Sequence, residues 1–303
     1  MPADWRPLYP FSSHYLTLDR LRYHYVDEGH YIDEGHYVDQ GSGSPLVFVH
    51  GNPTWSFYWR NLIVGLRDDY RCVAVDHMGC GLSDKPQDYP YTLAQHTENL
   101  CRLIEQLDLR NLTMLVHDWG GAIGLGAAVK LRERISRLVI FNTAAFPPPF
   151  VPARIAVCRT PIVGRFALRG LNLFARAALS MAVEKPERMT PPVQAGLLAP
   201  YDNWANRVAI WRFVRDIPFA RSHPTHATLA ALEQNLPTLA DLPISMIWGM
   251  RDWCFRPECL RRFQAVFPNA ESHELADCGH YVIEDAHERI VPLVKQFLNK
   301  HAV

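Results

Sequence analysis

Short, wholly apolar runs alternate with longer helical patterns through the first half of this chain, and this alternation restricts the possible folds more than any other feature. The apolar runs are PLVFVHG (45–51), YRCVAVDHMGCG (70–81), LTMLVHD (112–118) and RLVIFNT (137–143). Between them, residues 92–109 and 120–135 place apolar side chains at helical spacing. Continuous apolar strands separated by amphipathic helices are typical of a parallel sheet covered on both faces.

The alternation stops at residue 147. The stretch PPPFVP (147–152) ends any regular element, because each proline fixes φ and removes a backbone donor. From there to about residue 226 the chain is rich in Arg, Ala, Leu and aromatic residues, which we interpret as helices with proline breaks. We therefore predict that residues 147–226 form an inserted helical cap.

Strand patterns return after this insertion, at PISMIWGMRD (243–252) and AESHELADCGH (270–280). RIVPLVKQFLNKH (289–301) then has the pattern of a closing helix. The predicted fold class is α/β, with a mostly parallel central sheet covered by helices on both faces. Residues 1–146 and 227–303 would form its core.

Three arginines of the insertion are spaced as on one helix face: Arg165, Arg169 and Arg176. No acidic residue occurs between 147 and 183. A helix that meets a membrane surface or a protein partner has this pattern, and so does the solvated face of a lid helix. The solvated face is the commoner case in a neutral protein and is the interpretation taken here, although self-association into homo-oligomers through this helix stays open.

Charge and cysteine content restrict the partners. The chain has 303 residues with 31 basic and 31 acidic side chains, so no long-range field attracts nucleic acid. No apolar run approaches the ~20 residues that cross a bilayer, and we expect no membrane partner. The seven cysteines are scattered and lack CxxC spacing, which favours reduced thiols, a cytoplasmic location and no metal site.

The strongest local motif is MLVHDWGGAIG (114–124), in which a strand leads through a tight turn into a helix with Asp118 at the apex. This is the pattern of a nucleophile elbow, with a carboxylate where serine is usual. Small Gly120 and Gly121 let the helix begin close to the turn. A carboxylate nucleophile attacks carbon and forms an ester. A helix N-cap is the commoner role for a lone Asp, so the assignment depends on partners elsewhere in the chain.

Those partners occur in the required order of nucleophile, acid and histidine. Asp252 follows the strand pattern of SMIWGMRDWCF (245–255), and His280 lies between a strand and the final helix. We therefore predict a triad of Asp118, Asp252 and His280.

Two further residues have the chemistry to hold an anion next to this triad. The loop after the first apolar run, HGNP (50–53), presents its backbone to the elbow, where oxyanion donors belong. The side-chain amide of Asn52 and the indole N–H of Trp119 are able to donate two hydrogen bonds to a departing halide. Neither this step nor the ester chemistry needs a metal or an organic cofactor.

These motifs resemble those of the haloalkane dehalogenase family of the α/β-hydrolase fold. The resemblance covers residues from about 10 to 300 and is carried by HGNPTWSFYWR (50–60), DHMGCGLSDKP (76–86), HDWGGAIG (117–124), WGMRDWCF (248–255) and CGHYVIED (278–285). It implies that Asp118 is the nucleophile, His280 the base and Asp252 the acid, with Asn52 and Trp119 stabilising halide. The implied substrate is a small apolar halogenated molecule, hydrolysed with water to an alcohol and halide.

The position of the acid divides the family. One branch carries it after the preceding strand, where this chain has only Asn142, which cannot ionise. The choice of Asp252 and the GCGLSDKP turn resemble the branch called subfamily III. That branch is similar to β-lactone decarboxylases, so an apolar lactone substrate is the alternative.

Two other functions are less well supported by the residues. Epoxide hydrolysis commonly uses two lid tyrosines, and Tyr201 is the only tyrosine between residues 92 and 280. A non-catalytic binding protein on the same fold would be indicated by a broken triad, and the triad motifs are all present.

A near-perfect repeat, HYVDEG HYIDEG HYVDQG, occupies residues 24–41. Alternating apolar and polar residues indicate strand, and the resemblance implies that one copy within RLRYHYVDEG (20–29) is sufficient. We interpret the two further copies as an extension of an edge hairpin or loop rather than a metal site. Deleting residues 30–41 is expected to leave activity nearly unchanged.

Overall fold

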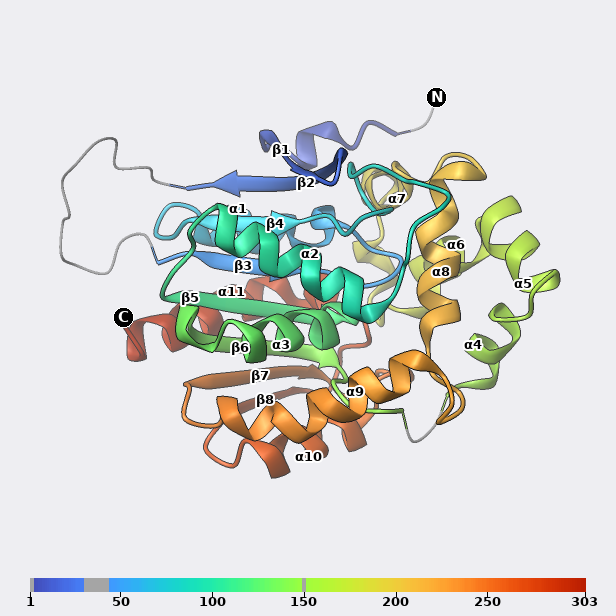
Figure 1. Cartoon of the computed structure of the whole chain (residues 1–303). Helices are drawn as coiled ribbons and strands as arrows, with labels where there is room; N and C mark the ends of the chain where they lie inside the picture. The colour runs from blue at the N-terminus through green and yellow to red at the C-terminus, as the bar shows by residue number, and fades with distance from the viewer. Residues whose placement is uncertain (1–2, 30–43, 149–150) are drawn as a thin grey trace.

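A computed structural model describes residues 3–29, 44–148 and 151–303, and in these residues eight strands form one sheet (Figure 1). The spatial order is β1-β2-β4-β3-β5-β6-β7-β8, antiparallel at β1/β2 and β2/β4 and parallel elsewhere. The strands are β1 (Ser13–Leu18), β2 (Leu21–Glu28), β3 (Leu46–Val49), β4 (Cys72–Val75), β5 (Leu112–Asp118), β6 (Ile135–Thr143), β7 (Ile244–Gly249) and β8 (Glu271–Leu275). The predicted α/β class and mostly parallel sheet are confirmed.

Helices cover both faces of the sheet, as the unbroken apolar strands require. On one face, α1 (Arg60–Leu66) packs against α11 (Val282–Lys300), and α11 contacts β6 and β7. The other face carries α2 (Leu93–Gln106), α3 (Trp119–Lys130), α9 (Pro224–Asn235) and α10 (Pro257–Val266).

Alternation of side chains along the strands divides the core into two apolar layers. In β3, Val47 and Val49 join the layer under α2 and α3, while Leu46 and Phe48 join the layer under α1 and α11. All four side chains are fully buried, and burial of one such side chain stabilises the fold by about 1.5–3 kcal/mol. A strand buried on both faces therefore has no polar positions, which explains the unbroken apolar runs.

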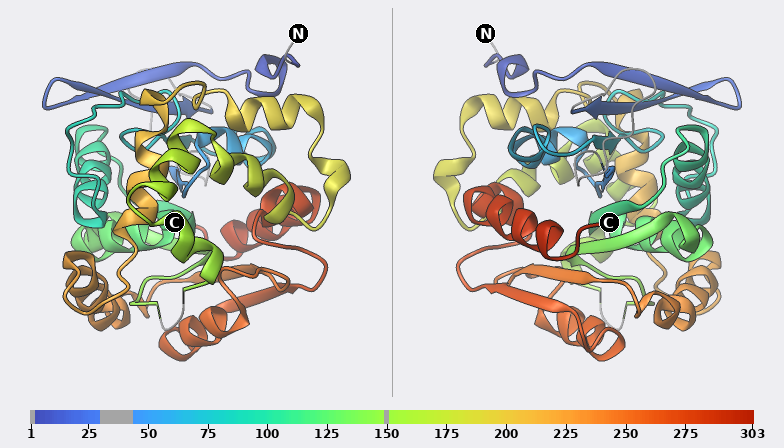
Figure 2. Two further views of the ribbon diagram at one scale, coloured as in Figure 1. Left: turned by 90° about the vertical axis from the view of Figure 1, so that its right-hand side faces the viewer. Right: turned by 90° about the vertical axis from the view of Figure 1, so that its left-hand side faces the viewer.

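A group of short helices lies beyond the carboxyl ends of the parallel strands (Figure 1) and faces the viewer in the left panel of Figure 2. The helices are α4 (Ala153–Cys158), α5 (Val163–Arg165), the π-helix η4 (Phe166–Gly170), α6 (Leu173–Met181), α7 (Pro191–Leu198) and α8 (Val208–Asp216). Two single-turn 3-10 helices, at Pro186–Arg188 and Ala205–Arg207, lie between them, and a third, at Leu236–Leu239, follows α9 and packs against α3. The division into a core and a 147–226 cap stays a prediction.

The structure contradicts the single arginine-bearing helix face. The chain is not one helix there, because η4 ends at Gly170 and Asn172 adopts a left-handed φ of 55° before α6 begins. Arg165 and Arg176 are exposed, but Arg169 is only 4% exposed and donates to Gln87 Oε1 at 2.5 Å.

Other predicted elements are present, but their observed bounds differ from the predicted ones. The closing helix begins at Val282, seven residues before the predicted start, with non-helical dihedral angles at Ala286. The sequence patterns did not indicate α1 or α10. The first repeat copy lies in β2 and its following turn, where His24 is buried, and the copies at 30–41 lie outside the described residues.

Two expected absences concern the described part of the chain. In residues 3–29, 44–148 and 151–303 no helix is long and apolar enough to span a membrane, and no cluster of His, Cys, Asp and Glu is arranged for a metal ion. All seven cysteines are free thiols.

Candidate active site

Asp118 lies at the end of β5, in a turn so tight that α3 begins at the next residue. Its φ of 53° and ψ of −130° are strained for a residue with a side chain, which is the geometry of a nucleophile elbow. The Thr143 hydroxyl, at the end of β6, donates to the Asp118 carbonyl and holds the turn. A Cβ at Gly120 would lie 2.0 Å from the Val49 carbonyl oxygen, and one at Gly121 would lie 1.8 Å from Thr143 Oγ1. Only glycine allows α3 to begin so close to the sheet.

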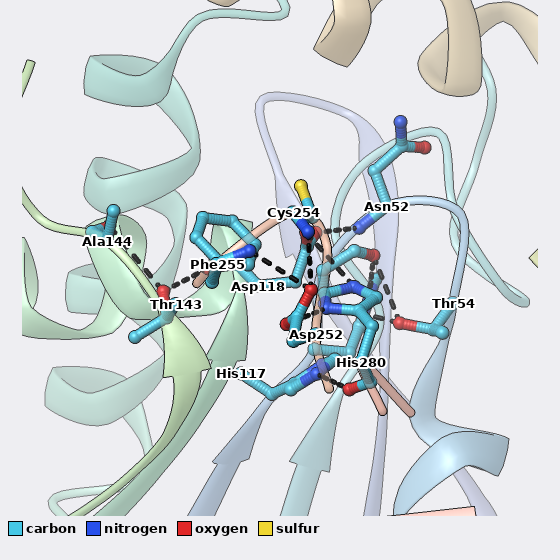
Figure 3. A network of polar contacts seen from close by, with 12 residues as sticks. Asn52, Thr54, His117, Asp118, Thr143, Ala144, Asp252, Cys254, Phe255 and His280 are labelled. Carbon is cyan, nitrogen blue, oxygen red and sulfur yellow. Dashed lines mark hydrogen bonds and ion pairs between the residues drawn. The ribbon is translucent and has the colours of Figure 1, made fainter. Parts of the chain in front are cut away.

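The loop after β3 holds one oxygen of the Asp118 carboxylate. The Asn52 main-chain N–H donates to Asp118 Oδ1 at 2.6 Å (Figure 3). A Cβ at Gly51 would lie 2.0 Å from the same oxygen, so the loop can approach only because residue 51 is glycine. This contact leaves Oδ2 facing His280, whose Nε2 lies 3.6 Å away.

Asp252 orients the histidine from the opposite side. Its Oδ2 accepts from His280 Nδ1 at 2.8 Å, which places the second ring nitrogen, Nε2, toward Asp118. The other oxygen of Asp252 accepts from the main-chain N–H groups of Cys254 at 2.6 Å and Phe255 at 3.0 Å. With Asp252 only 3% exposed, these bonds fix the position of its carboxyl group.

A second histidine, His117, packs against the ring of His280 with ring centroids 4.7 Å apart. His117 Nε2 donates to the His280 main-chain carbonyl at 2.8 Å, so the same residue also fixes the backbone of the loop that carries His280. Burial lowers the pKa of His117 well below its usual value, as does the neighbouring His280, and the ring is neutral. Sequence reasoning missed this residue, although a histidine inside the apolar run LTMLVHD was a signal for it.

The pKa values of Asp118 and His280 are both raised, and each of the two groups acts on the other. Burial raises the pKa of Asp118, while His280 and the main-chain N–H groups of Trp119 and Asn52 oppose that rise. Burial lowers the pKa of His280, but the carboxylates of Asp252 and Asp118 outweigh it and raise the pKa above its usual value. The imidazolium form of His280 is therefore stabilised by two neighbouring carboxylates.

Asp118 opens into a cavity of about 240 Å³ whose wall is mainly apolar. The core contributes Ala122, Ala144 and Phe146, and the helices beyond the strands contribute Val151, Pro152, Ile155, Phe174, Val214 and Ile217. Asn52 and Trp119 also line the cavity, as do the thiols of Cys254 and Cys259. Burial raises the pKa of Cys254 well above its usual value, so it remains a thiol next to Asp118.

Asn52 and Trp119, the two residues predicted to bind an anion, have side chains in different surroundings. Asn52 Nδ2 donates to the Ile210 carbonyl of α8 at 3.2 Å, and its Oδ1 has no partner among the described residues. Its amide points away from Asp118 and His280 (Figure 3). Trp119 is partly buried, with its ring 5.4 Å from that of Phe213.

Asn142, the position of the acid in the other family branch, has a structural role. Its side chain donates to the Gly249 carbonyl at 2.9 Å and accepts from the Gly249 N–H at 2.8 Å. Both polar groups of the amide are satisfied, and the bonds join the ends of β6 and β7. Asp252, seated after β7, is therefore the carboxylate that reaches the histidine.

The structure brings all five predicted site residues to one place. Asp118, His280 and Asp252 form a continuous line of contacts, and Asn52 and Trp119 border the same cavity. The functional contacts that the sequence did not predict are those of His117, Thr143, Cys254 and Phe255. Two of these, Cys254 and Phe255, act through the main chain, which leaves no residue-type signal in a sequence.

Comparisons with known proteins agree with the observed fold. A family described as alpha/beta hydrolase fold matches residues 44–286. The chain is 39% identical to the cis-3-alkyl-4-alkyloxetan-2-one decarboxylase of Shewanella oneidensis, over 97% of this chain and 90% of that protein. It is 42% identical to the decarboxylase of the same name from Xanthomonas campestris pv. campestris, over 91% and 92%.

Dehalogenases are also similar. Haloalkane dehalogenase 2 of Mycobacterium bovis is 34% identical over 97% of this chain and 98% of its own length. Among solved structures, the haloalkane dehalogenase DatA from Agrobacterium tumefaciens C58 has a TM-score of 0.83 at 27% identity, covering 96% of this chain and 97% of that chain.

Proposed function

Because the chain belongs to the α/β-hydrolase fold family, we propose that it is an enzyme that forms a covalent ester on Asp118. The observation that supports this is the orientation of one carboxylate: Oδ1 is held by Asn52 N–H, and Oδ2 faces His280 at the base of an apolar cavity. In this proposal His280 is the base and Asp252 its acid partner. Asn52 and Trp119 supply N–H donors to anions that form in the site.

The preferred substrate is a β-lactone with two alkyl substituents, which the enzyme converts to an alkene and carbon dioxide. Two relatives named for this reaction are 39% and 42% identical to the chain, whereas the dehalogenase relative is 34% identical. The cavity also suits alkyl groups, since its wall is formed mainly by aliphatic, proline and phenylalanine side chains.

In the first step, Asp118 Oδ2 attacks the saturated ring carbon that is bonded to the ring oxygen, from the face opposite that oxygen. A bond forms between Oδ2 and this carbon, and the carbon–oxygen bond of the ring breaks with its electron pair. The former lactone carbonyl becomes a free carboxylate. Asp118 Oδ1 becomes the carbonyl oxygen of the new ester and stays hydrogen-bonded to Asn52 N–H.

In the second step, the bond between the free carboxylate and its neighbouring carbon breaks. Its electron pair forms the carbon–carbon double bond, and Asp118 leaves as a carboxylate. Carbon dioxide and an alkene are released, Asp118 is regenerated, and no water is consumed. Inversion in the first step followed by anti elimination converts a cis-substituted lactone to a cis alkene.

Hydrolysis of a carbon–halogen bond is the second candidate, favoured by the presence of Trp119 and Asn52 on the cavity wall beside the nucleophile. Asp118 displaces halide in line, and those two side chains receive the departing ion. His280 then removes a proton from water, which attacks the ester carbonyl carbon and releases the alcohol. The Asn52 side chain would have to exchange its bond to Ile210 for the halide.

Other functions fit the site less well. Tyr201 is 1% exposed and its hydroxyl donates to the Thr54 carbonyl at 3.1 Å, so it is not directed at a substrate as epoxide opening requires. A binding protein with a vestigial site has no need of the intact contacts between Asp118, His280 and Asp252. We further propose residues 147–226 as the cap over the cavity, and a cytoplasmic location.

Parallel assays with a cis-dialkyl β-lactone and a panel of bromoalkanes test the proposal. We expect cis alkene from the lactone, and slower bromide release from bromoalkanes. Turnover in ¹⁸O-labelled water separates the two routes at Asp118 itself. Lactone turnover leaves the Asp118 peptide unlabelled, whereas ester hydrolysis transfers ¹⁸O to its carboxylate. Bromide release with ¹⁸O on Asp118, and no alkene from the lactone, would establish the second candidate instead.

A further inference from the structure

The outer side of the helices beyond the strands carries an unusual concentration of exposed apolar side chains. Of thirteen large hydrophobic side chains that are exposed in the described residues, nine lie between 157 and 219. Six of them lie on or beside α4, α5, η4 and α6: Val157, Ile162, Val163, Phe166, Leu171 and Leu173. These four elements contact one another in series and face the viewer together in Figure 2, left. We call this surface the cap face.

Exposure on the cap face is extreme for apolar residues. Ile162 is 83% exposed, Val163 65% and Phe166 59%. Single exposed apolar side chains are common on proteins, but a contiguous apolar surface marks a site of interaction.

The charged residues of the cap face are all of one sign. Arg154, Arg159, Arg165 and Arg176 lie on or beside the same helices and are exposed or partly exposed, and residues 147–183 contain no Asp or Glu. Within the described residues these four arginines form no ion pair, although Arg159 and Arg165 lie over the rings of Phe219 and Trp204. The rest of the chain supplies the compensating acids, since its formal net charge is zero.

The cap face and the cavity are opposite sides of the same helices. Ile155 of α4 and Phe174 of α6 line the cavity, while Val157 and Leu173 of those helices are exposed outside. An apolar molecule that arrives at the cap face is thus one helix away from Asp118.

We propose that the cap face docks on the surface of a lipid bilayer that contains anionic headgroups. Apolar side chains would insert at the boundary of the acyl chains while the arginines contact phosphate, which is how interfacial amphipathic surfaces bind. A second copy of this chain is a poorer occupant, because it would bring an equally positive surface against the first. The inference adds a lipid partner to an enzyme for which the sequence suggested none, and it goes beyond the proposed function.

Vesicle flotation tests the proposal without any substrate, so its outcome is independent of the reaction. The full chain is mixed with vesicles of phosphatidylcholine alone or of equal parts phosphatidylcholine and phosphatidylglycerol. We expect floating protein with the anionic vesicles, and less as salt is raised. The double variant Arg165→Glu, Arg176→Glu should bind at least about tenfold more weakly, since each arginine near an anionic surface strengthens binding about fivefold.

Matched variants separate the apolar contribution from general effects. Ile162→Ser with Phe166→Ser should reduce flotation, whereas Val64→Ser on α1 and Arg110→Glu before β5 should not. The proposal would be overturned if the protein binds neither kind of vesicle or binds both equally. It would also be overturned if the control variants lose as much vesicle binding as the cap-face variants. A protein that does not bind vesicles but sediments as a dimer would also overturn the proposal. If the Ile162→Ser, Phe166→Ser variant then sediments as a monomer, the cap face is the contact with a second copy of the chain.

Discussion

At the scale of single residues, the site depends on a few close approaches that only particular side chains permit. Glycine at 51, 120 and 121 allows two loops and a helix to meet around Asp118, because a Cβ at any of them would lie 2.0 Å or less from a neighbouring oxygen. The strained turn exposes one carboxylate oxygen and satisfies the other. The reactivity proposed for Asp118 thus depends on backbone placement as much as on residue type.

The predicted identities of the site residues came from residue type, spacing and chain order. Asp118, Asp252 and His280 were found because carboxylates and a histidine followed strand patterns in the order that a triad needs. The partners that work through their main chain, such as Cys254 and Phe255, could not be found in this way, because any residue except proline supplies an N–H.

The role of Asp252 gives a prediction at this scale. Asp252→Asn removes the charge that raises the pKa of His280 and lets the amide donate rather than accept, which disturbs the tautomer of the ring. We expect any bromoalkane hydrolysis to fall by about 10³-fold to 10⁴-fold, and its pH profile to shift toward lower pH. Steady-state rates against pH measure both effects.

The double variant Asp252→Asn, Asn142→Asp is the control for this assignment. Asn142 is bound at both polar groups to Gly249, so a carboxylate there should not restore activity and should destabilise the fold by about 1–3 kcal/mol. Recovered turnover in the double variant would mean that the acid can act from β6, contrary to the geometry described above.

At the scale of elements, one buried carboxylate joins the helices beyond the strands to the core. Asp216, at the end of α8, accepts from the Leu93 N–H at the start of α2 and from the Thr225 hydroxyl at the start of α9. Burial raises the pKa of Asp216 to about 6, and these two hydrogen bonds and Arg159 limit the rise. Three elements from separate parts of the chain therefore share one titrating group.

Stability should depend on pH through Asp216. Because its pKa is higher in the folded than in the unfolded chain, the folded state binds more protons between about pH 4 and pH 6. The free energy of unfolding should fall as pH rises through that interval, by roughly 3 kcal/mol from this group. Asp216→Asn is neutral at every pH; its amide oxygen accepts from the Leu93 N–H and its NH2 group donates to the Thr225 hydroxyl. The variant should therefore be more stable at pH 7 and lose that part of the slope.

Urea unfolding at several pH values measures the effect. Asp68→Asn, an exposed change on the surface, is the matched control and should keep the slope of the unchanged protein. An Asp216→Asn protein that is less stable at pH 7, with the slope retained, would show that the carboxylate is favoured in its charged form.

At the scale of the whole molecule, the sheet was predictable because buried parallel strands have a strong sequence pattern. The apolar run LTMLVHD corresponds to β5 residue for residue, and the remaining predicted strands lie within a few residues of their observed ends. The resemblance to haloalkane dehalogenases, with decarboxylases close by, is confirmed by the relatives of both names.

The region beyond the strands was less predictable, because its helices are short and broken. The π-helix η4 and the left-handed Asn172 interrupt what the arginine spacing indicated as one helix. Tertiary packing decides such breaks, since Arg169 turns inward to Gln87 and to the carbonyl of Trp204. The same packing leaves Ile162 and Phe166 on the outside, where a periodic helix would have hidden part of them.

The central claim is that Asp118 is the covalent nucleophile, and one variant tests it most directly. His280→Phe removes the base that activates water, so an ester formed with a reactive dibromoalkane cannot be hydrolysed. We predict that intact mass rises by one bromoalkyl group and that fragmentation places the group on Asp118, with no increase when Asp118→Asn is added. An unmodified protein, or a group attached to Cys254 in the same cavity, would contradict the claim.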